Sequence, residues 1–582
     1  MPALVLAFVV WDTVVRSQHI LRVTESYGVT VDAPAIEAKS PTGYAHGVRS
    51  MMLPEAGEDT AHWVMQTQTM IARGEWRLRH VDYDNAPAGR EVHWAAAFHW
   101  WLELLAWIDH LATGRPIGIS VERATLSYGV VMFALLLAGL MPLLNRKFSP
   151  VAAAITAIGA VSTSTFYTDF LPGRADHHGL VNTCALLMVL FMVIGSTQPE
   201  GEPGNAGPES NPARRTARRW FVASAVAGGV GVWISAATII PVLVGIGLGV
   251  LAAAWFGRGP ARPISWMRDP GLFRLWGMVG SGISLAAYLI EYFPSHLGLR
   301  LEVNHPLYAA AWLGGAELIR LGVCLIGRLR PLNRRDLVAA TCGAALVALP
   351  PVIILLTRTR TFLLLDPFLW ELHKSYITEE QGLLRLLVTN AKQPWNIATL
   401  CLPFLLLVPP LVMTFRSSTP GETRAMLALA LCPAVLGATQ SWSQVRWLSL
   451  AFALSVPAIA VFFRALESRG GSRRGPIIAW SLACGLLFAP GAVKAVRQTL
   501  AGADFTKQEI RNLAQRAVAH WLRQRAGDDR VVVATSPAAT TMLISQGGLT
   551  GVDTLYWENT ERLARAAELF GAPTTEAAHD LV

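Results

Sequence analysis

Long apolar runs alternate with polar segments along most of the 582-residue chain. A run of about 20 apolar residues is long enough to cross a bilayer as a helix. The stretch from Trp220 to Phe256 is too long for one crossing, and we divide it near Ser235. The pattern then predicts thirteen spans, several of them short, at Pro2–Val15, Ala124–Leu144, Val151–Phe166, Leu180–Ile194, Trp220–Ser235, Ala236–Phe256, Phe273–Phe293, Pro306–Ile326, Leu337–Leu356, Ile397–Phe415, Met426–Gly437, Trp447–Phe463 and Pro476–Val493.

The composition agrees with an α-helical polytopic membrane protein. Hydrophobic residues make up 52% of the chain and charged residues only 15%, whereas a soluble protein carries about 25% charged residues. The net charge of +9 is explained by arginine-rich loops between the spans. We therefore predict a membrane protein with no nucleic-acid partner.

The order of the charged loops predicts the topology. If the N-terminus is cytoplasmic, every predicted inside loop carries at least two basic residues, as in Arg146–Lys147, Arg214–Arg219 and Arg328–Arg335. This is the asymmetry that the positive-inside rule requires. We expect a multi-pass protein of a bacterial inner membrane, with the remaining loops, the tail and the active site on the extracytoplasmic side.

Two domains are predicted, a transmembrane domain at 1–493 and a small outside α/β domain at 494–582. Within the first domain, 16–123 form a large outside loop and 357–396 a second long one. Ala95–Leu111 has an apolar face but also carries acids and histidines, which is typical of an interfacial helix. The tail is predicted to contain a helix, a strand and a second helix at Phe505–Arg525, Arg530–Ala534 and Leu563–Phe570.

A charged cluster lies between two apolar runs, in the segment Leu171–Leu180 (LPGRADHHGL). Because bare charge is costly in hydrocarbon, we expect it at a membrane surface or in a wet cavity. Asp176 and His178 are two positions apart, so one extended turn can direct both at a single point. An oxygen and an imidazole nitrogen together suit Mn²⁺, Mg²⁺ or a related ion. The alternative is a polar loop in which Asp176 caps the next helix.

Other predicted outside segments carry polar residues that could meet in one cavity. Asp82 and Asp84 resemble a paired-aspartate metal motif, although such a run is also typical of a turn. The remaining candidates are Asp59 and His93 in the first outside loop, Glu302 and His305 in the third, Glu379 in the fourth, and Arg446 at the outer end of the twelfth span.

This layout resembles the catalytic subunit of oligosaccharyltransferases, a family of GT-C membrane glycosyltransferases. That family has thirteen spans, a C-terminal outside domain and an acidic residue in its first outside loop. Its second outside loop carries an Asp-x-(Asp/Glu/His) pair, and Gly173–His178 fits the archaeal form Gly-x-x-Asp-His-His. Tyr376–Gln381 resembles the Thr-Ile-x-Glu type of motif in a later loop, and Asp82–Trp94 resembles the Tyr-Pro-x-Gly…His-Trp segment. The resemblance covers nearly the whole chain and implies a GT-C fold.

The resemblance also implies a metal-dependent glycosyltransferase that moves a glycan from a polyprenyl-(pyro)phosphate donor to an acceptor protein or glycan. Asp59, Asp176 and His178 would hold the divalent metal, Mn or Mg, which acts as a Lewis acid on the leaving group. Asp59 could instead cap its helix, and Arg446 could extend to the interface without a partner. The resemblance also implies a catalytic role for Glu379, with Glu302 as the second choice. It implies substrate-binding roles for Arg446, His93 and His305.

One departure from the family leaves the acceptor open. The family places Trp-Trp-Asp-Tyr-Gly just after the first strand of its outside domain, where it grips the acceptor sequon. Val531–Thr540 lacks this motif, although Gly551–Thr560 still resembles the family's continuation. Transfer to a lipid or polysaccharide acceptor is therefore an alternative to asparagine in protein. Other classes are a non-catalytic lipid-glycan binder or a transporter, which would carry its charges within the spans.

Overall fold

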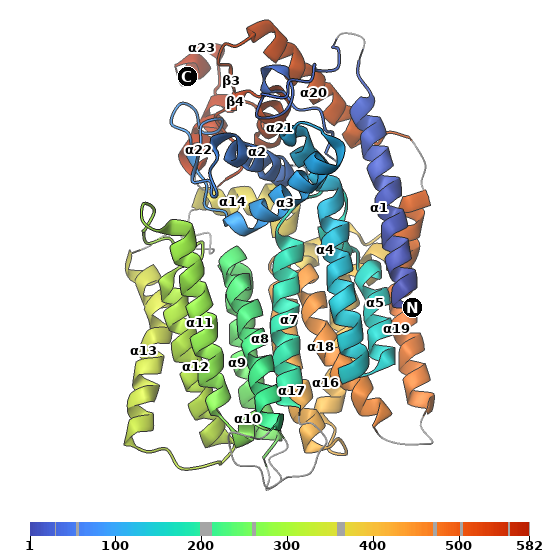
Figure 1. Cartoon of the computed structure of the whole chain (residues 1–582), viewed down its shortest axis with the longest axis vertical. Helices are drawn as coiled ribbons and strands as arrows, with labels where there is room; N and C mark the ends of the chain where they lie inside the picture. The colour runs from blue at the N-terminus through green and yellow to red at the C-terminus, as the bar shows by residue number, and fades with distance from the viewer. Residues whose placement is uncertain are drawn as a thin grey trace.

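Helices dominate the chain, in a computed structural model that describes residues 1–28, 31–53, 58–197, 212–258, 264–357, 367–468, 474–500, 504–556 and 559–580. Long helices form a bundle, and shorter elements cover one end of it as a unit that we call the head unit (Figure 1). The bundle contains α1 (Pro2–Glu25), α4 (Ile117–Lys147), α5 (Pro150–Ser162), α6 (Ser164–Tyr167), η2 (Thr168–Phe170), α7 (His178–Ser196), α8 (Pro212–Ile234), α9 (Ala236–Phe256), α10 (Ser265–Arg268), α11 (Gly271–Tyr292), α12 (Pro306–Ile326), α13 (Arg334–Thr357), α16 (Pro394–Phe415), α17 (Gly421–Gln440), α18 (Trp447–Glu467) and α19 (Arg474–Leu500).

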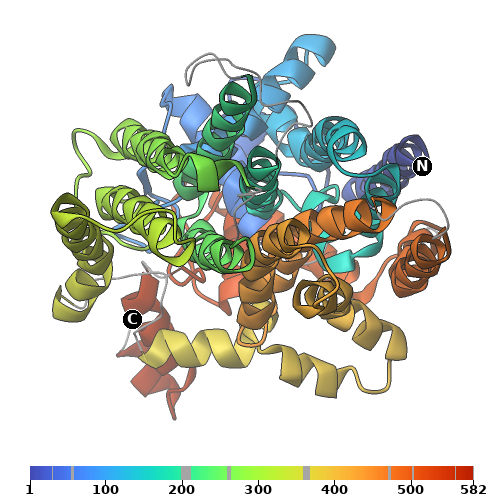
Figure 2. The ribbon, with the colours of Figure 1, turned by 90° about the horizontal axis from the view of Figure 1, so that it is seen from below.

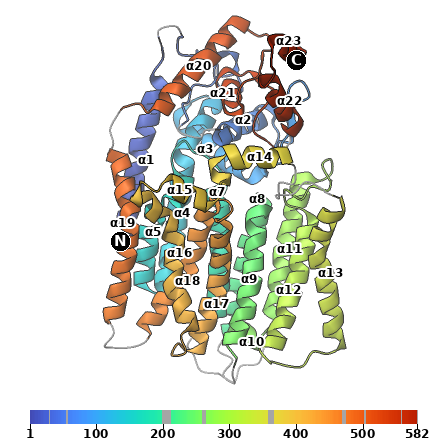
Figure 3. The same ribbon diagram turned by 180° about the vertical axis from the view of Figure 1, so that it is seen from behind.

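The head unit is built from the first long loop and the tail, with the loop before α16 beneath them (Figure 3). Strand β1 pairs antiparallel with β2, and strand β3 pairs parallel with β4. These elements are η1 (Ala45–Gly47), α2 (Glu58–Arg73), β1 (His80–Val81), β2 (Arg90–Glu91), α3 (Ala96–Thr113), α14 (Pro367–Tyr376), η3 (Thr378–Glu380), α15 (Leu383–Thr389), α20 (Lys507–Ala526), β3 (Val532–Val533), α21 (Pro537–Gly547), β4 (Thr550–Gly551), α22 (Thr560–Phe570) and α23 (Thr575–His579).

Each of the thirteen predicted spans falls on a bundle helix. Among the described residues, eleven helices are long and apolar enough to cross a membrane. The count rises to twelve with the bent pair Pro150–Ser162 and Ser164–Phe170, which turns by 72°. Helix α8 is the remaining predicted span, and it falls short because four arginines in its first turns lower its mean hydropathy. The protein is therefore a multi-pass membrane protein.

The predicted division of the longest apolar run near Ser235 is confirmed. Helix α8 ends at Ile234 and α9 begins at Ala236. Ser235 has an extended backbone, and its hydroxyl accepts a hydrogen bond from the amide of Thr238. A serine whose hydroxyl accepts a hydrogen bond from an otherwise unpaired amide of the first helical turn is a favourable N-cap. A polar residue inside this apolar run therefore marks the start of the next helix.

Two helices form the centre of the bundle. In the spanning windows, 94% of α18 and 78% of α7 is buried, against 11% of α13 and 17% of α19. Figure 2 shows the latter two at the periphery. Asn182 of α7 donates to the hydroxyl of Ser449 in α18 at 2.8 Å. Both central helices begin at the end of the bundle that the head unit covers (Figure 1).

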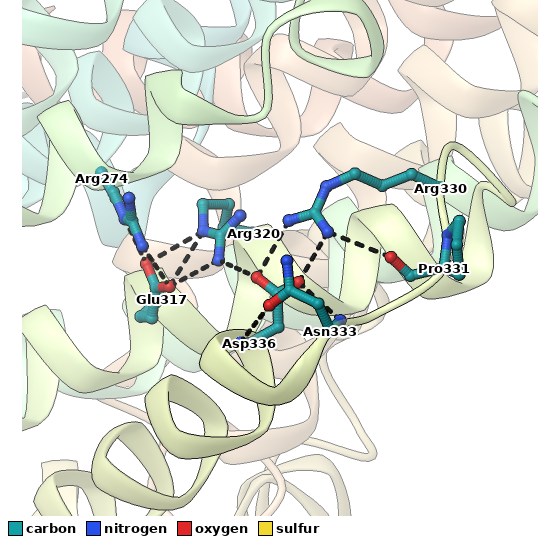
Figure 4. Close-up of polar contacts among 7 residues, drawn as sticks. All are labelled: Arg274, Glu317, Arg320, Arg330, Pro331, Asn333 and Asp336. Carbon is teal, nitrogen blue, oxygen red and sulfur yellow. Dashed lines mark hydrogen bonds and ion pairs between the residues drawn. The ribbon is translucent and has the colours of Figure 1, made fainter.

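Five charged residues connect three helices (Figure 4), and we call them the arginine network: Arg274, Glu317, Arg320, Arg330 and Asp336. Helices α11 and α13 begin close to Arg274 and Asp336, at the end of the bundle away from the head unit (Figure 1). Arg274 of α11 forms two hydrogen bonds with Glu317 of α12, at 2.7 and 2.8 Å. Arg320 bridges Glu317 and Asp336 of α13, and Arg330 forms a second bidentate pair with Asp336. This network attaches the peripheral α13 to the bundle.

Candidate functional site

The loop before α7 is fixed to the head unit and to α4. Gly173 has φ +72°, a backbone conformation that glycine adopts without strain, and its amide donates to the Thr125 carbonyl. Tyr128 donates to the carbonyl of Arg174 at 2.6 Å, and Thr60 of α2 donates to the carbonyl of Ala175 at 3.1 Å. The residue that follows, Asp176, is thus placed by contacts from two other elements.

Asp176, His177 and His178 offer ligand atoms that all lie within 4.8 Å of one another. The Nδ1 atom of His177 lies 2.7 Å from Asp176 Oδ1, and Nε2 of His178 lies 3.4 Å from Asp176 Oδ2. The Asp176 side chain keeps 17% of its surface exposed and that of His178 32%. Among the described residues this is the one group found with the composition and spacing of a metal site. The N-cap of α7 is His177, so the alternative of Asp176 as N-cap is wrong.

The electrostatics of this loop favour an ionised Asp176. Burial alone would raise the pKa of Asp176, but the charges of His178 and His177 and two hydrogen bonds from His177 lower it below its usual range. Burial would likewise lower the pKa of His177, but the charge and hydrogen bond of Asp176 raise it. The carboxylate is therefore kept in the form that binds cations.

Asp59 lies in the first turn of α2 and interacts electrostatically with Asp176 of this loop. Burial, followed by the charges of Asp176, Glu379 and Glu58, raises the pKa of Asp59 to about 8. The tail also reaches this point, since the hydroxyl of Tyr556 lies 3.2 Å from Asp59 Oδ1. Both burial and nearby like charges disfavour the ionised form of a carboxyl group, and together they outweigh the opposing charge of His177 at Asp59.

Glu379 and Arg446 come together although 67 positions of the chain, including α15, α16 and α17, separate them. The amide of Arg446 donates to the carbonyl of Glu379 at 3.1 Å, and that of Val445 to Gln381 at 2.9 Å. The Arg446 guanidinium pairs with Glu380 at 2.6 Å, while its buried Nε makes no hydrogen bond to a described residue. Arg446 directly precedes α18, so both central helices begin at the candidate site.

The other predicted residues lie apart from this group or have partners of their own. The carboxylate of Asp84 is buried and pairs with Arg90 at 2.6 Å, which agrees with the turn interpretation of the paired aspartates. The exposed Asp82 pairs with Arg73. The remaining candidates lie near the ends of α11 and α12 that the head unit covers. The His305 ring accepts from the amide of Leu307 as a helix cap, Glu302 interacts electrostatically with Tyr292 and Tyr308, and the carbonyl of His93 accepts from Tyr292.

Sequence reasoning missed three residues of the site. His177 was not among the predicted ligands, yet its ring contributes to the Asp176 group. Glu380 holds Arg446, and Tyr556 contacts Asp59. The acidic doublet Glu379-Glu380 was a sequence signal for the contact between Glu380 and Arg446. The contact of Tyr556 depends on how the tail packs on α2, which no local pattern reveals.

Comparison with known proteins places this geometry in a known fold. No protein-family model matches the chain, and no curated protein matches it by sequence. The archaeal oligosaccharyltransferase AglB from Archaeoglobus fulgidus, solved with an inhibitory peptide and a dolichol-phosphate, aligns over 98% of this chain and 68% of its own, with 15% identity and a TM-score of 0.62. Its apo form aligns over 99% and 68%, with 14% identity and a TM-score of 0.62. This chain has the GT-C oligosaccharyltransferase fold.

The oligosaccharyltransferase resemblance implied by the motifs is thereby confirmed at the level of fold. A third structure of the Archaeoglobus enzyme, tethered to an acceptor peptide with the sequon NVT, aligns over 98% of this chain and 68% of its own, with 14% identity and a TM-score of 0.58. Another was solved with zinc and sulfate. Within the oligosaccharyltransferase fold of this chain, the acids that we call the acidic cluster are Asp59, Asp176 and Glu379.

Proposed function

We propose that this protein is a metal-dependent membrane glycosyltransferase that takes a glycan from a polyprenyl-(pyro)phosphate donor. The observation that supports the proposal is the group of Asp176, His177 and His178 at the head-unit end of the bundle, in a chain with the oligosaccharyltransferase fold. Asp59 lies outside that group of ligand atoms but interacts electrostatically with Asp176 and Glu379. The three acids come from separate segments of the chain. The bound dolichol-phosphate of AglB supports a lipid-linked donor.

The residues of this chain fit a divalent cation. Carboxylate and imidazole ligands suit Mn²⁺ or Mg²⁺, and Asp176 is held ionised with part of its surface accessible. Burial and the neighbouring acids raise the pKa of Asp59, and a bound cation would remove that repulsion. Asp59, Asp176 and His178 would hold the ion, which would supply Lewis-acid stabilisation of the leaving phosphate.

Glu379 and Arg446 would act on the two substrates. A carboxylate at position 379 can orient or deprotonate the acceptor nucleophile. Arg446 is held by Glu380 through one terminal nitrogen, and its Nε has no described hydrogen-bond partner. The remaining guanidinium donors can bind a phosphate oxygen, for which arginine has favourable geometry.

The acceptor has a second candidate. The segment after β3 lacks Trp-Trp-Asp-Tyr-Gly, and helix α21 begins at Pro537, in the same segment. A site that hydrogen-bonds a substrate hydroxyl can reject its absence by roughly 10⁴-fold, but the residues for such discrimination are not visible here. This favours a lipid or polysaccharide acceptor, or weak discrimination between Asn-x-Thr and Asn-x-Ala peptides.

The test is to incubate the purified full chain and Mn²⁺ with a labelled polyprenyl-pyrophosphate glycan and a panel of peptide, lipid and polysaccharide acceptors. We expect label to leave the donor, slowly by hydrolysis and faster with the correct acceptor. Asp176→Ala should abolish release. Asp82→Ala is the matched control, because Asp82 is an exposed acid paired with Arg73. Equal release by Asp176→Ala and the unmodified protein would refute the proposed function.

A further inference from the structure

The tail is joined to the first outside loop by backbone and side-chain hydrogen bonds. The amide of Gly551 donates to the carbonyl of Tyr83 at 2.8 Å, and the amide of Ala86 donates to the carbonyl of Gly551 at 3.0 Å. The hydroxyl of Thr554 donates to the buried carboxylate of Asp84 at 2.5 Å. These bonds connect residues more than 460 positions apart, so the tail segment has a fixed place beside α2.

This attachment delivers Tyr556 to the acidic cluster. The Tyr556 hydroxyl lies 3.2 Å from Asp59 Oδ1, and its residue is only 7% exposed. The Arg90 guanidinium stacks over the Tyr556 ring at 4.1 Å. The rings of His62 and Trp94 approach it edge-on, at 4.6 and 5.4 Å between centroids. Packing from three sides leaves the ring one orientation, in which the hydroxyl points at Asp59.

We propose that Tyr556 is a positioning residue, through which the tail orients the carboxylate of Asp59 for cation binding. This inference rests on the proposed function. A hydroxyl that donates to Oδ1 fixes the carboxylate plane and leaves Oδ2 for the ion. Outer hydrogen bonds of this kind typically change metal affinity or activity by about 10–100-fold when they are removed. The tail thus completes the site, although it lacks the acceptor-gripping motif of the resembling family.

The experiment measures Mn²⁺ binding directly, by the loss of the free-ion electron paramagnetic resonance signal on titration of the purified full chain. Tyr556→Phe keeps the ring and its packing but removes the donor, and we expect about tenfold weaker Mn²⁺ binding. Donor turnover by this variant should recover with excess Mn²⁺, with unchanged KM for the donor. Tyr83→Phe is the matched control, since Tyr83 packs against the same His62 at 6.1 Å, and its Mn²⁺ affinity should equal that of the unmodified protein.

A double-mutant cycle separates orientation of Asp59 from a general structural effect. In an Asp59→Ala background the Tyr556→Phe change should have no further effect on Mn²⁺ affinity, because coupled residues are non-additive. Additive losses, or unchanged affinity in Tyr556→Phe, would overturn the positioning role. If Asp176→Ala binds Mn²⁺ as tightly as the unmodified protein, the proposed function fails instead, so the two failures are distinguishable.

Discussion

The acidic cluster and the arginine network are two groups of charged residues at opposite ends of one helical bundle. In the arginine network, three guanidinium groups face two carboxylates, and each carboxylate accepts bidentate hydrogen bonds. In the acidic cluster, burial and the neighbouring carboxylates raise the pKa of Asp59. In the first arrangement each carboxylate has arginine partners, whereas in the second Asp59 is buried beside other acids and would ionise readily only with a cation bound. The partners of the carboxylates, rather than the presence of charge, distinguish a structural contact from a candidate binding site.

Removal of a carboxylate from the acidic cluster should have the largest effect. Asp59→Ala removes one proposed ligand, and we expect donor turnover to fall by more than the roughly 10–100-fold that is typical for loss of an outer hydrogen bond. The folded state should lose little, because the change removes a buried carboxyl group whose ionised form is disfavoured by burial and by Asp176 and Glu379. Parallel assays of labelled-donor release and thermal unfolding check both parts. Unchanged turnover in Asp59→Ala, with Asp82→Ala as the reference, would remove Asp59 from the site.

Removal of a carboxylate from the arginine network should have the opposite outcome. The Glu317 side chain is 15% exposed and that of Arg320 is 9% exposed, so Glu317→Ala leaves a largely buried arginine without one of its partners. Breaking such a pair costs about 3 kcal/mol, and unfolding in detergent should show this loss. Turnover per folded molecule should stay unchanged. A loss of turnover without a loss of stability would contradict the assignment of this network to structure.

Addition and removal of a divalent cation should affect only one end of the bundle. An ion at a hundredfold excess over its Kd stabilises the folded state by about 2.7 kcal/mol. We therefore expect Mn²⁺ to raise the Tm of the unmodified protein and of Glu317→Ala equally, and EDTA to reverse the rise. Asp176→Ala should show no such rise. An equal Mn²⁺-dependent rise in Asp176→Ala would indicate that the ion binds elsewhere.

The smallest effect is expected at the exposed edge of the arginine network. The Arg274 side chain is 56% exposed, and exposed ion pairs contribute about 0–1 kcal/mol. Arg274→Ala should therefore shift unfolding far less than Arg320→Ala, whose side chain is 9% exposed and contacts both acids. Equal shifts would show that the network acts as one cooperative unit.

The spans were predictable because apolar runs reflect the bilayer directly, and the break at Ser235 followed from length alone. The end of α1 was less predictable from the apolar pattern. The prediction ended at Val15, but the helix continues to Glu25, because its polar second half packs against the tail through contacts such as His19 with Glu509. Helix α21 was also missed, since its run of alanines and threonines after Pro537 gives no apolar periodicity.

The candidate site was partly predictable for a similar reason. Asp176 and Glu379 are acids in polar loops that border spans, and such positions are rare enough to attract attention. The pairing of Glu380 with Arg446 and the contact of Tyr556 with Asp59 join distant segments. Those contacts are decided by tertiary packing, which a single sequence does not display.

The packing of α1 against α20 has a consequence for biosynthesis. His19 and Glu509 are 490 positions apart, and Arg516 of α20 donates to the carbonyl of Thr24 at the end of α1. At about 5–20 residues per second of translation, roughly 25 to 100 seconds pass between the synthesis of these two surfaces. During that interval the second half of α1 lacks its contacts with α20, and its surface is accessible to proteases and chaperones. Assembly of the head unit is thus one of the last steps in making the protein.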